Sequence, residues 1–347
     1  MQQPNQKVRA LPLSRGILAL AFLLLFGCTN ARPPEQPRSG FGGTDYVTTH
    51  VTKQHIIRNG TSFFVFAPVA SDAPLSRPAQ LVLFFHGWTL TNPATYGGWL
   101  DHLARRGCVV LCPEYEPTTS TPMGAFTANA MQSVHEAVGW LRERHDLPVD
   151  WDHVVVVGHS AGGILAANYA VLAKSAQAPV PKAVFAVHPG TYWVRRSDNY
   201  TPLENMAEMA PDTLLLVLQG DEDRLALPRD GRELIASTTN VPPEKKRLVV
   251  LHADGHGRPK IQSGHFACFA QDSAYDANAI INGVEVSSAD RKVEIEPQTY
   301  LVYWRLLDAL IAAPPGCSLN EALGGEPTTL DLGAWSDGTP IRRLEER

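Results

Sequence analysis

The chain has 347 residues, of which 44% are hydrophobic and 19% charged, and its formal net charge at pH 7 is −5. This composition is that of a folded globular protein and excludes a largely disordered chain. The small negative charge offers no basic surface to a phosphate backbone, so we expect no nucleic-acid partner.

The first 27 residues have the layout of a lipoprotein-type signal peptide. A basic start is followed by an apolar run from Gly16 to Gly27, an order typical of a secretory signal. The run is shorter than the roughly 20 apolar residues of a membrane-spanning helix. The Gly27-Cys28 step resembles a bacterial lipobox, which implies lipidation of Cys28. We therefore expect an exported protein with an N-terminal lipid anchor at the bacterial outer membrane or in the periplasm; an ordinary signal peptide or an uncleaved anchor is the alternative.

Composition divides the rest of the chain into three parts. Residues 28–44 are rich in Pro, Arg and Gly without apolar periodicity, which predicts a tether. Residues 45–313 carry the regular strand and helix patterns, and we expect one folded domain there. Residues 314–347 begin with two prolines and a glycine and have little periodicity. We expect this C-terminal tail to lie over the surface or to fray.

From residue 46 onward, strand patterns and helix patterns alternate. A hairpin is predicted over 46–57 and 61–67, because Arg58-Asn59-Gly60 is a turn signal. Buried strands are predicted at 81–85, 108–112, 153–157, 183–187, 213–218 and 247–251. Helices are predicted at 99–106, 126–144, from 160 onward, near 229–237 and at 299–311. This order predicts a mostly parallel sheet with helices on both faces.

The candidate nucleophile is Ser160, the central residue of Gly158-His159-Ser160-Ala161-Gly162. Four consecutive valines, 154–157, precede this pentapeptide and an apolar helical pattern follows it. A serine on a sharp turn between a buried strand and a helix exposes its hydroxyl above the sheet, which is the context that a Gly-x-Ser-x-Gly motif requires. The alternative is a glycine-rich turn without chemistry.

This arrangement resembles the α/β-hydrolase superfamily, and the resemblance covers Tyr46 to Ile311. It implies an α/β-hydrolase fold with a mostly parallel eight-stranded sheet and a catalytic triad in the order serine, acid, histidine. The acid should follow the strand at 213–218, where Gly220 and Asp223 match the Gly-x-x-Asp pattern of the family. Asp223 would then hold the imidazole in one tautomer.

Two histidines compete for the role of the general base. His256 has the usual short offset from the strand at 247–251 and has small neighbours. His265, in Ser-Gly-His-Phe-Ala, resembles the histidine loop of cutinase-like polyester hydrolases. The insertion 258–263 makes this loop longer than usual. We favour His265 and keep His256 as the alternate base.

The oxyanion hole requires two backbone N–H donors. The resemblance implies that Ala161, directly after the nucleophile, supplies one of them. The second is expected in the loop Phe85-His86-Gly87-Trp88-Thr89, whose His-Gly-x pattern points to Trp88 as the donor. His86 itself is expected to be structural.

Four cysteines follow Cys28, and an oxidising compartment would permit disulfides between them. We favour a disulfide between Cys268 and Cys317, because both lie in the loop-rich C-terminal third. The resemblance agrees with this choice, since cutinase-like enzymes carry a disulfide near the catalytic histidine. The other two, Cys108 and Cys112, flank a strand and are expected to be buried apolar residues.

Together these features predict a serine hydrolase that cleaves carboxylic esters of small molecules or lipids through an acyl-enzyme intermediate. No metal or organic cofactor is implied. A thioesterase or peptidase on the same fold remains an alternative, because a fold does not fix the leaving group. A non-catalytic, envelope-tethered binding protein with this fold is the alternative from another class.

Overall fold

A computed structural model of the chain describes residues 30–69, 77–190, 199–271, 280–281, 284–285, 295–325 and 330–347. The predicted signal peptide and Cys28 lie outside these residues. Within the described part of the chain, no helix combines the length and the apolar character needed to cross a membrane.

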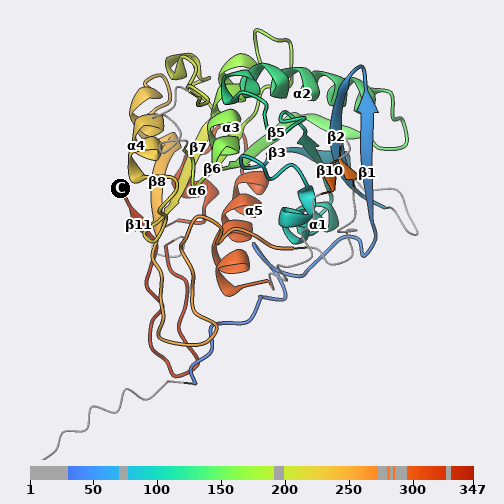
Figure 1. Ribbon diagram of the computed structural model, residues 1–347. Helices are drawn as coiled ribbons and strands as arrows, with labels where there is room; N and C mark the ends of the chain where they lie inside the picture. Colours follow the sequence, from blue (N-terminus) through green and yellow to red (C-terminus); the bar gives the residue numbers. More distant parts are fainter. Residues whose placement is uncertain are drawn as a thin grey trace, which may run out of the picture.

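A nine-stranded sheet forms the centre of the molecule (Figure 1). Its strands are β1 (Val51–Arg58), β2 (Thr61–Pro68), β3 (Ala79–Phe85), β4 (Cys108–Pro113), β5 (Val149–His159), β6 (Ala183–Val187), β7 (Leu214–Gly220), β8 (Lys246–Leu251) and β11 (Glu345–Glu346). They lie side by side in the order β1-β2-β4-β3-β5-β6-β7-β8-β11. The pairs from β4 through β8 are parallel, whereas β1, β2 and β11 join antiparallel. This is the α/β-hydrolase fold that the sequence predicts, with one more strand than expected.

Helices cover both faces of the sheet. The apolar residues of α2 (Phe126–Arg142), α3 (Ala161–Leu172) and α4 (Pro228–Ser237) belong to one core cluster. Those of α1 (Gly97–Arg105), α5 (Arg305–Ala312) and α6 (Leu319–Ala322) belong to the cluster on the opposite face. Short segments complete the list: η1 (Pro93–Tyr96), η2 (Met123–Ala125), η4 (Met206–Glu208), η5 (Pro243–Lys245), η6 (Thr299–Trp304) and the two-stranded pair β9 (Ile280–Ile281) and β10 (Val284–Glu285).

Strand β3 shows why the central strands read as unbroken apolar runs. Val82 and Phe84 point into the cluster formed with α1 and α5. Leu81, Leu83 and Phe85 point into the cluster formed with α2 and α3. Because side chains alternate between two covered faces, all five positions from Leu81 to Phe85 are buried and apolar.

The C-terminal tail is anchored to the domain. Residues 345–346 add β11 to the edge of β8. Before that strand, Trp335 and Ile341 are buried, at 2% and 1% exposure. Ser336 donates its backbone N–H to Arg32 O, and Arg32 N–H donates to Ser336 Oγ. Figure 1 shows the two terminal segments running side by side in an arm below the sheet. Of the two alternatives for this tail, residues 330–347 lie on the domain and do not fray.

The described part of the expected tether is also bound to the domain. Tyr300 donates its hydroxyl hydrogen to Pro34 O at 2.8 Å, and Gly42 N–H donates to the buried carboxylate of Asp308 at 2.8 Å. Ala31 is buried, and its carbonyl accepts the N–H of Arg258. The composition of residues 28–44 did not reveal these contacts, because the segment makes them mostly with its backbone atoms.

The predicted disulfide is wrong. Cys268 and Cys317 are both free thiols. Cys268 is fully buried in the core and lies within electrostatic range of Asp223. Cys317 is partly exposed and lies near Glu321 and Lys245. A shared loop-rich region of the sequence does not bring two sulfur atoms to bonding distance. Cys108 and Cys112 are buried and free, as expected for apolar strand residues.

Replacement of Trp335 tests whether the arm is part of the folded core. Its ring packs against Gly257, where an added Cβ would lie 2.3 Å from Cε3, and its Nε1–H donates to Asp254. We expect Trp335→Ala to lower the free energy of unfolding by about 3–5 kcal/mol, measured by urea denaturation and circular dichroism. Trp151→Ala, at a partly exposed tryptophan, is the control and should cost less. Equal losses in both variants would contradict a core role for the arm.

Candidate active site

Ser160 lies on the turn between β5 and α3. Its backbone has φ 57° and ψ −123°, a conformation that residues with a side chain rarely adopt. Its N–H donates to Val187 O at 3.0 Å, and its carbonyl accepts Gly163 N–H at 2.9 Å. Strained residues persist where the surrounding structure holds them, and they cluster at functional sites. The turn therefore presents the hydroxyl at the carboxyl edge of the parallel strands.

The two glycines of the pentapeptide allow the strand, the helix and the neighbouring loop to cross closely. A Cβ on Gly158 would lie 1.9 Å from Gly162 O, and a Cβ on Gly162 would lie 2.2 Å from Phe85 O. Neither contact involves a flexible side chain that could move aside. The spacing Gly-x-Ser-x-Gly is thus a packing requirement of this turn.

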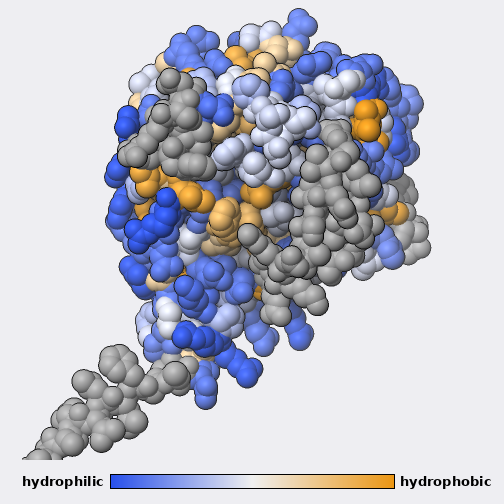
Figure 2. All heavy atoms as spheres, in the orientation of Figure 1, coloured by the Kyte–Doolittle hydropathy of each residue, from blue (hydrophilic) through white to orange (hydrophobic). Residues whose placement is uncertain are grey.

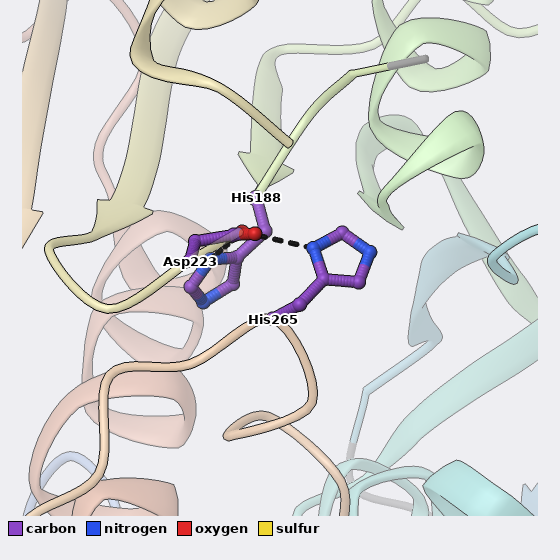
Figure 3. Close-up of side chains that lie close together, drawn as sticks. All are labelled: His188, Asp223 and His265. Carbon is purple, nitrogen blue, oxygen red and sulfur yellow. Dashed lines mark hydrogen bonds and ion pairs between the residues drawn. The ribbon is translucent and has the colours of Figure 1, made fainter. Parts of the chain in front are cut away.

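Ser160, His265 and Asp223 are joined by two hydrogen bonds. His265 Nε2 lies 2.9 Å from Ser160 Oγ, and His265 Nδ1 lies 2.8 Å from Asp223 Oδ2. Figure 3 shows the Asp223 carboxylate pointing at the His265 ring. An ionised carboxylate only accepts, so Nδ1 carries the hydrogen and Nε2 is left to accept the Ser160 hydroxyl hydrogen. His265 and Asp223 are 8% and 6% exposed.

His256, the alternate base, lies away from Ser160 in the arm, which consists of residues 30–34, 254–261 and 330–344. Its Nε2 is 2.7 Å from Asp337 Oδ2, and its ring packs beside Trp335. The inserted segment returns to the domain through an antiparallel bridge between Asp254 and Ile261. The structure therefore brings His265, and not His256, to the nucleophile.

Asp223 follows β7 and accepts four hydrogen bonds. Its Oδ1 accepts the backbone N–H groups of Leu225 and Ala226 at 2.8 and 2.9 Å. Its Oδ2 accepts from His265 at 2.8 Å and from His188 at 2.9 Å. Burial raises the pKa of Asp223, but the hydrogen bonds from the two histidines outweigh it and hold the pKa well below its usual range. The carboxylate is therefore ionised at neutral pH.

His188 was missed by the sequence analysis. It directly follows β6, has a φ of 46° and is fully buried. Its Nδ1 contacts Asp223, and its Nε2 lies 2.8 Å from the hydroxyl of Tyr303. The available signal was its position: a polar residue at the carboxyl end of a buried parallel strand faces the same sheet edge as Ser160 and Asp223.

The loop after β3 lies directly beside the nucleophile. A Cβ on Gly87 would lie 3.4 Å from Ser160 Cβ. Trp88, the expected oxyanion donor of this loop, follows Gly87, and Ala161 begins helix α3. Thr89, at φ 62°, donates its N–H to Glu116 Oε2 at 2.7 Å, which fixes the far side of the loop. The donor roles of Trp88 and Ala161 stay predictions.

A buried histidine connects this loop to the base. Gly87 N–H donates to Tyr96 Oη at 3.0 Å, and Tyr96 Oη lies 2.8 Å from His159 Nδ1. His159 Nε2 lies 2.9 Å from His265 O. Burial holds the pKa of His159 well below its usual value, so its neutral ring carries one N–H. The carbonyl of His265 must receive that N–H, and Tyr96 then donates to Nδ1.

The two histidines on Asp223 also meet the geometric condition for a metal site. The polar atoms of His188, Asp223 and His265 all lie within 4.8 Å of one another. The N···O separations of 2.8 and 2.9 Å are those of hydrogen bonds. Each histidine has a second partner, Ser160 or Tyr303. The three side chains therefore form a hydrogen-bond network in this structure.

Comparisons with known proteins agree with this fold. A family model described as the alpha/beta hydrolase fold matches residues 82–226, which include Ser160 and Asp223. Chlorophyllase-1 of Citrus unshiu and that of Citrus sinensis are each 34% identical over 90 residues, covering 24% of this chain. The chain spans about a quarter (26%) of the length of these curated relatives.

Solved esterase structures are similar at low sequence identity. Carboxyl esterase 2 of Tuber melanosporum is 17% identical, with a TM-score of 0.47, covering 63% of this chain and 82% of its own. A thermostable esterase of Pseudomonas putida ECU1011 is 19% identical, with a TM-score of 0.45, covering 62% and 74%.

Glu116 provides a test of the loop that flanks Ser160. It is 1% exposed, and burial raises its pKa to about 7 despite the hydrogen bond from Thr89. The folded protein therefore favours the protonated form, and stability falls as pH rises from the unfolded pKa near 4.5 through 7. Glu116→Gln keeps an acceptor without the charge. We expect its stability relative to wild type to increase between pH 5 and pH 8, by up to about 3 kcal/mol.

Urea denaturation of both proteins at the two pH values measures this difference. Glu244→Gln, at an exposed carboxylate, is the matched control and should show no such increase. A stability difference between Glu116→Gln and wild type that is the same at pH 5 and pH 8 would show that the folded protein does not disfavour the charged form of Glu116.

Proposed function

We propose that this chain, which has the α/β-hydrolase fold, is a serine hydrolase that cleaves carboxylic esters. The observation that carries the proposal is the connected pair of hydrogen bonds, 2.9 Å from Ser160 Oγ to His265 Nε2 and 2.8 Å from His265 Nδ1 to Asp223 Oδ2. A buried, ionised carboxylate, an imidazole in a fixed tautomer and a strained serine are the parts that nucleophilic acyl transfer requires.

The reaction proceeds in two halves. Ser160 Oγ attacks the acyl carbon while His265 Nε2 takes the hydroxyl proton. The bond to the leaving alcohol then breaks, and His265 returns that proton to the alcohol oxygen. In the second half a water molecule attacks the acyl-enzyme with His265 again as base, which releases the acid and restores Ser160. Asp223 stabilises the imidazolium in both halves.

Negative charge develops on the carbonyl oxygen in each half. The backbone N–H groups of Ala161 and Trp88 are the proposed donors to it. The location of Ala161 at the N-terminus of α3 and the closeness of Gly87 to Ser160 support this assignment. The loss of one such donor typically costs ~3–4 kcal/mol of transition-state stabilisation.

An exposed aromatic side chain beside His265 supports a substrate with an apolar part. Phe266, the residue after His265, is 46% exposed, and its ring packs on Phe269. An exposed aromatic side chain here offers contact to the apolar part of a small-molecule or lipid ester. Neither a thioester nor an amide is favoured by any particular contact, and a purely binding role leaves the connected triad without a purpose.

A panel of p-nitrophenyl esters and a fluorophosphonate probe test the proposal. We expect wild type to hydrolyse the esters and to be labelled by the probe, and Ser160→Ala to lose both properties. His265→Ala should lose at least ~10³-fold in kcat/KM, because general base catalysis is removed. His256→Ala is the matched control and should keep near-wild-type activity. An unlabelled, inactive wild type would instead favour the binding protein.

We also propose that the protein is exported and anchored by a lipid on Cys28. The support is the order of a basic start, a short apolar run and the Gly27-Cys28 step in the sequence. Expressed in a bacterial host with labelled palmitate, wild type should incorporate label and Cys28→Ala should not. Cys317→Ala controls for modification of another cysteine. Equal labelling of wild type and Cys28→Ala would reject the anchor.

A further inference from the structure

We propose that His188 is a positioning residue of the active site, which holds Asp223 in place and limits how strongly that carboxylate attracts the proton of His265. This inference rests on the proposed function, because it assigns His265 as the base. It goes beyond a serine, an acid and a base, since it gives the acid a second imidazole partner and the site a means of setting its working pH range.

The central observation is that both histidines share one oxygen. His188 Nδ1 lies 2.9 Å and His265 Nδ1 lies 2.8 Å from Asp223 Oδ2 (Figure 3). Because the carboxylate is ionised, each Nδ1 donates a hydrogen to it. A buried histidine with a purely structural role would also need hydrogen-bond partners, but it would not need to share Asp223 Oδ2 with His265.

Tyr303 of η6 fixes the protonation of His188. Burial lowers the pKa of His188 and outweighs the opposite effect of its hydrogen bond to Asp223, so the ring is neutral. With its hydrogen on Nδ1, its Nε2 accepts the hydroxyl hydrogen of Tyr303 at 2.8 Å. The chain of donors therefore runs from Tyr303 through His188 to Asp223.

The backbone holds the His188 ring in this position. Its N–H donates to Leu218 O at 2.7 Å, which continues the pairing of β6 with β7. A Cβ on Gly220 would lie 2.9 Å from His188 Cε1 and 1.6 Å from Ser263 O. Only glycine at 220 lets the imidazole and the loop of the base approach the strand end together.

The consequence for His265 is electrostatic. Each donor to Asp223 draws negative charge from the carboxylate, so the N–H of His188 weakens the attraction that Asp223 exerts on the His265 proton. His159, Cys268 and Tyr303 also lie near this pair, and all three are buried and neutral at neutral pH. Asp223 is therefore the charge that His188 modulates.

Three variants separate a positioning role from a structural one. His188→Ala removes the donor. His188→Asn keeps an N–H close to the position of the imidazole Nδ1, and asparagine tolerates a positive φ. Tyr303→Phe removes only the hydroxyl that orients His188 and leaves the ring of residue 303 in the core.

The first measurement is the pH profile of kcat/KM for the best p-nitrophenyl ester. We expect the acidic limb of His188→Ala to move up by about 0.5–1 pH unit, with a ~10-fold loss at the optimum. His188→Asn should return the limb to its wild-type position, and Tyr303→Phe should move it in the same direction by less. The second measurement, the NMR titration of the His265 imidazole, should show the same order without any substrate.

An unchanged limb and an unchanged NMR midpoint in folded His188→Ala overturn the proposal, whatever its activity. If His188→Ala does not fold, an unchanged limb and midpoint in Tyr303→Phe overturn it instead. An upward shift in His188→Asn equal to that of His188→Ala also rejects the role of the N–H. An inactive wild type refutes the proposed function, and the NMR order then decides the coupling of His188 and His265 through Asp223 on its own.

Discussion

The arrangement of the site depends on the hydrogen bonds that the Asp223 carboxylate accepts. Four N–H groups converge on it, two from its own turn and one from each of two imidazoles. A buried charge is costly unless it is fully hydrogen-bonded, so this carboxylate requires all of these partners. These hydrogen bonds hold the end of β6, the turn after β7 and the loop of His265 together at one point of the sheet edge.

Buried neutral histidines complete this network. His159 and His188 are each fully buried, and both ring nitrogens of each have a partner. His159 connects the loop of Gly87, through Tyr96, to the backbone of His265, and His188 connects Asp223 to Tyr303 of η6. A neutral imidazole has one donor and one acceptor. Each ring therefore accepts a hydrogen from a tyrosine hydroxyl at one nitrogen and donates a hydrogen from the other. One buried imidazole thus holds the backbone of His265, and the other holds the carboxylate of Asp223.

The periphery depends on contacts between segments that are distant in the chain. Residues 30–34 and 330–344 run along the arm, and hydrogen bonds between Arg32 and Ser336 join the two terminal segments of the described chain. Trp335 and Gly257 share the same small volume, so neither position could be enlarged without moving the other. An arm packed this closely belongs to the domain.

The sequence by itself determined the order of strands and helices, because a buried parallel strand reads as an unbroken apolar run and most of these runs are followed by a helical pattern. It also identified Ser160 as the residue on the turn between β5 and α3, since contacts within this local turn require the flanking glycines. Only the tertiary structure shows that His265, and not His256, lies next to Ser160, because the sequence does not say which part of an inserted loop returns to the sheet edge. It revealed the ninth strand and the contact of His188 with Asp223, and it removed the Cys268–Cys317 disulfide. Each of these depends on which distant segments meet, and local patterns of polarity carry no information on that.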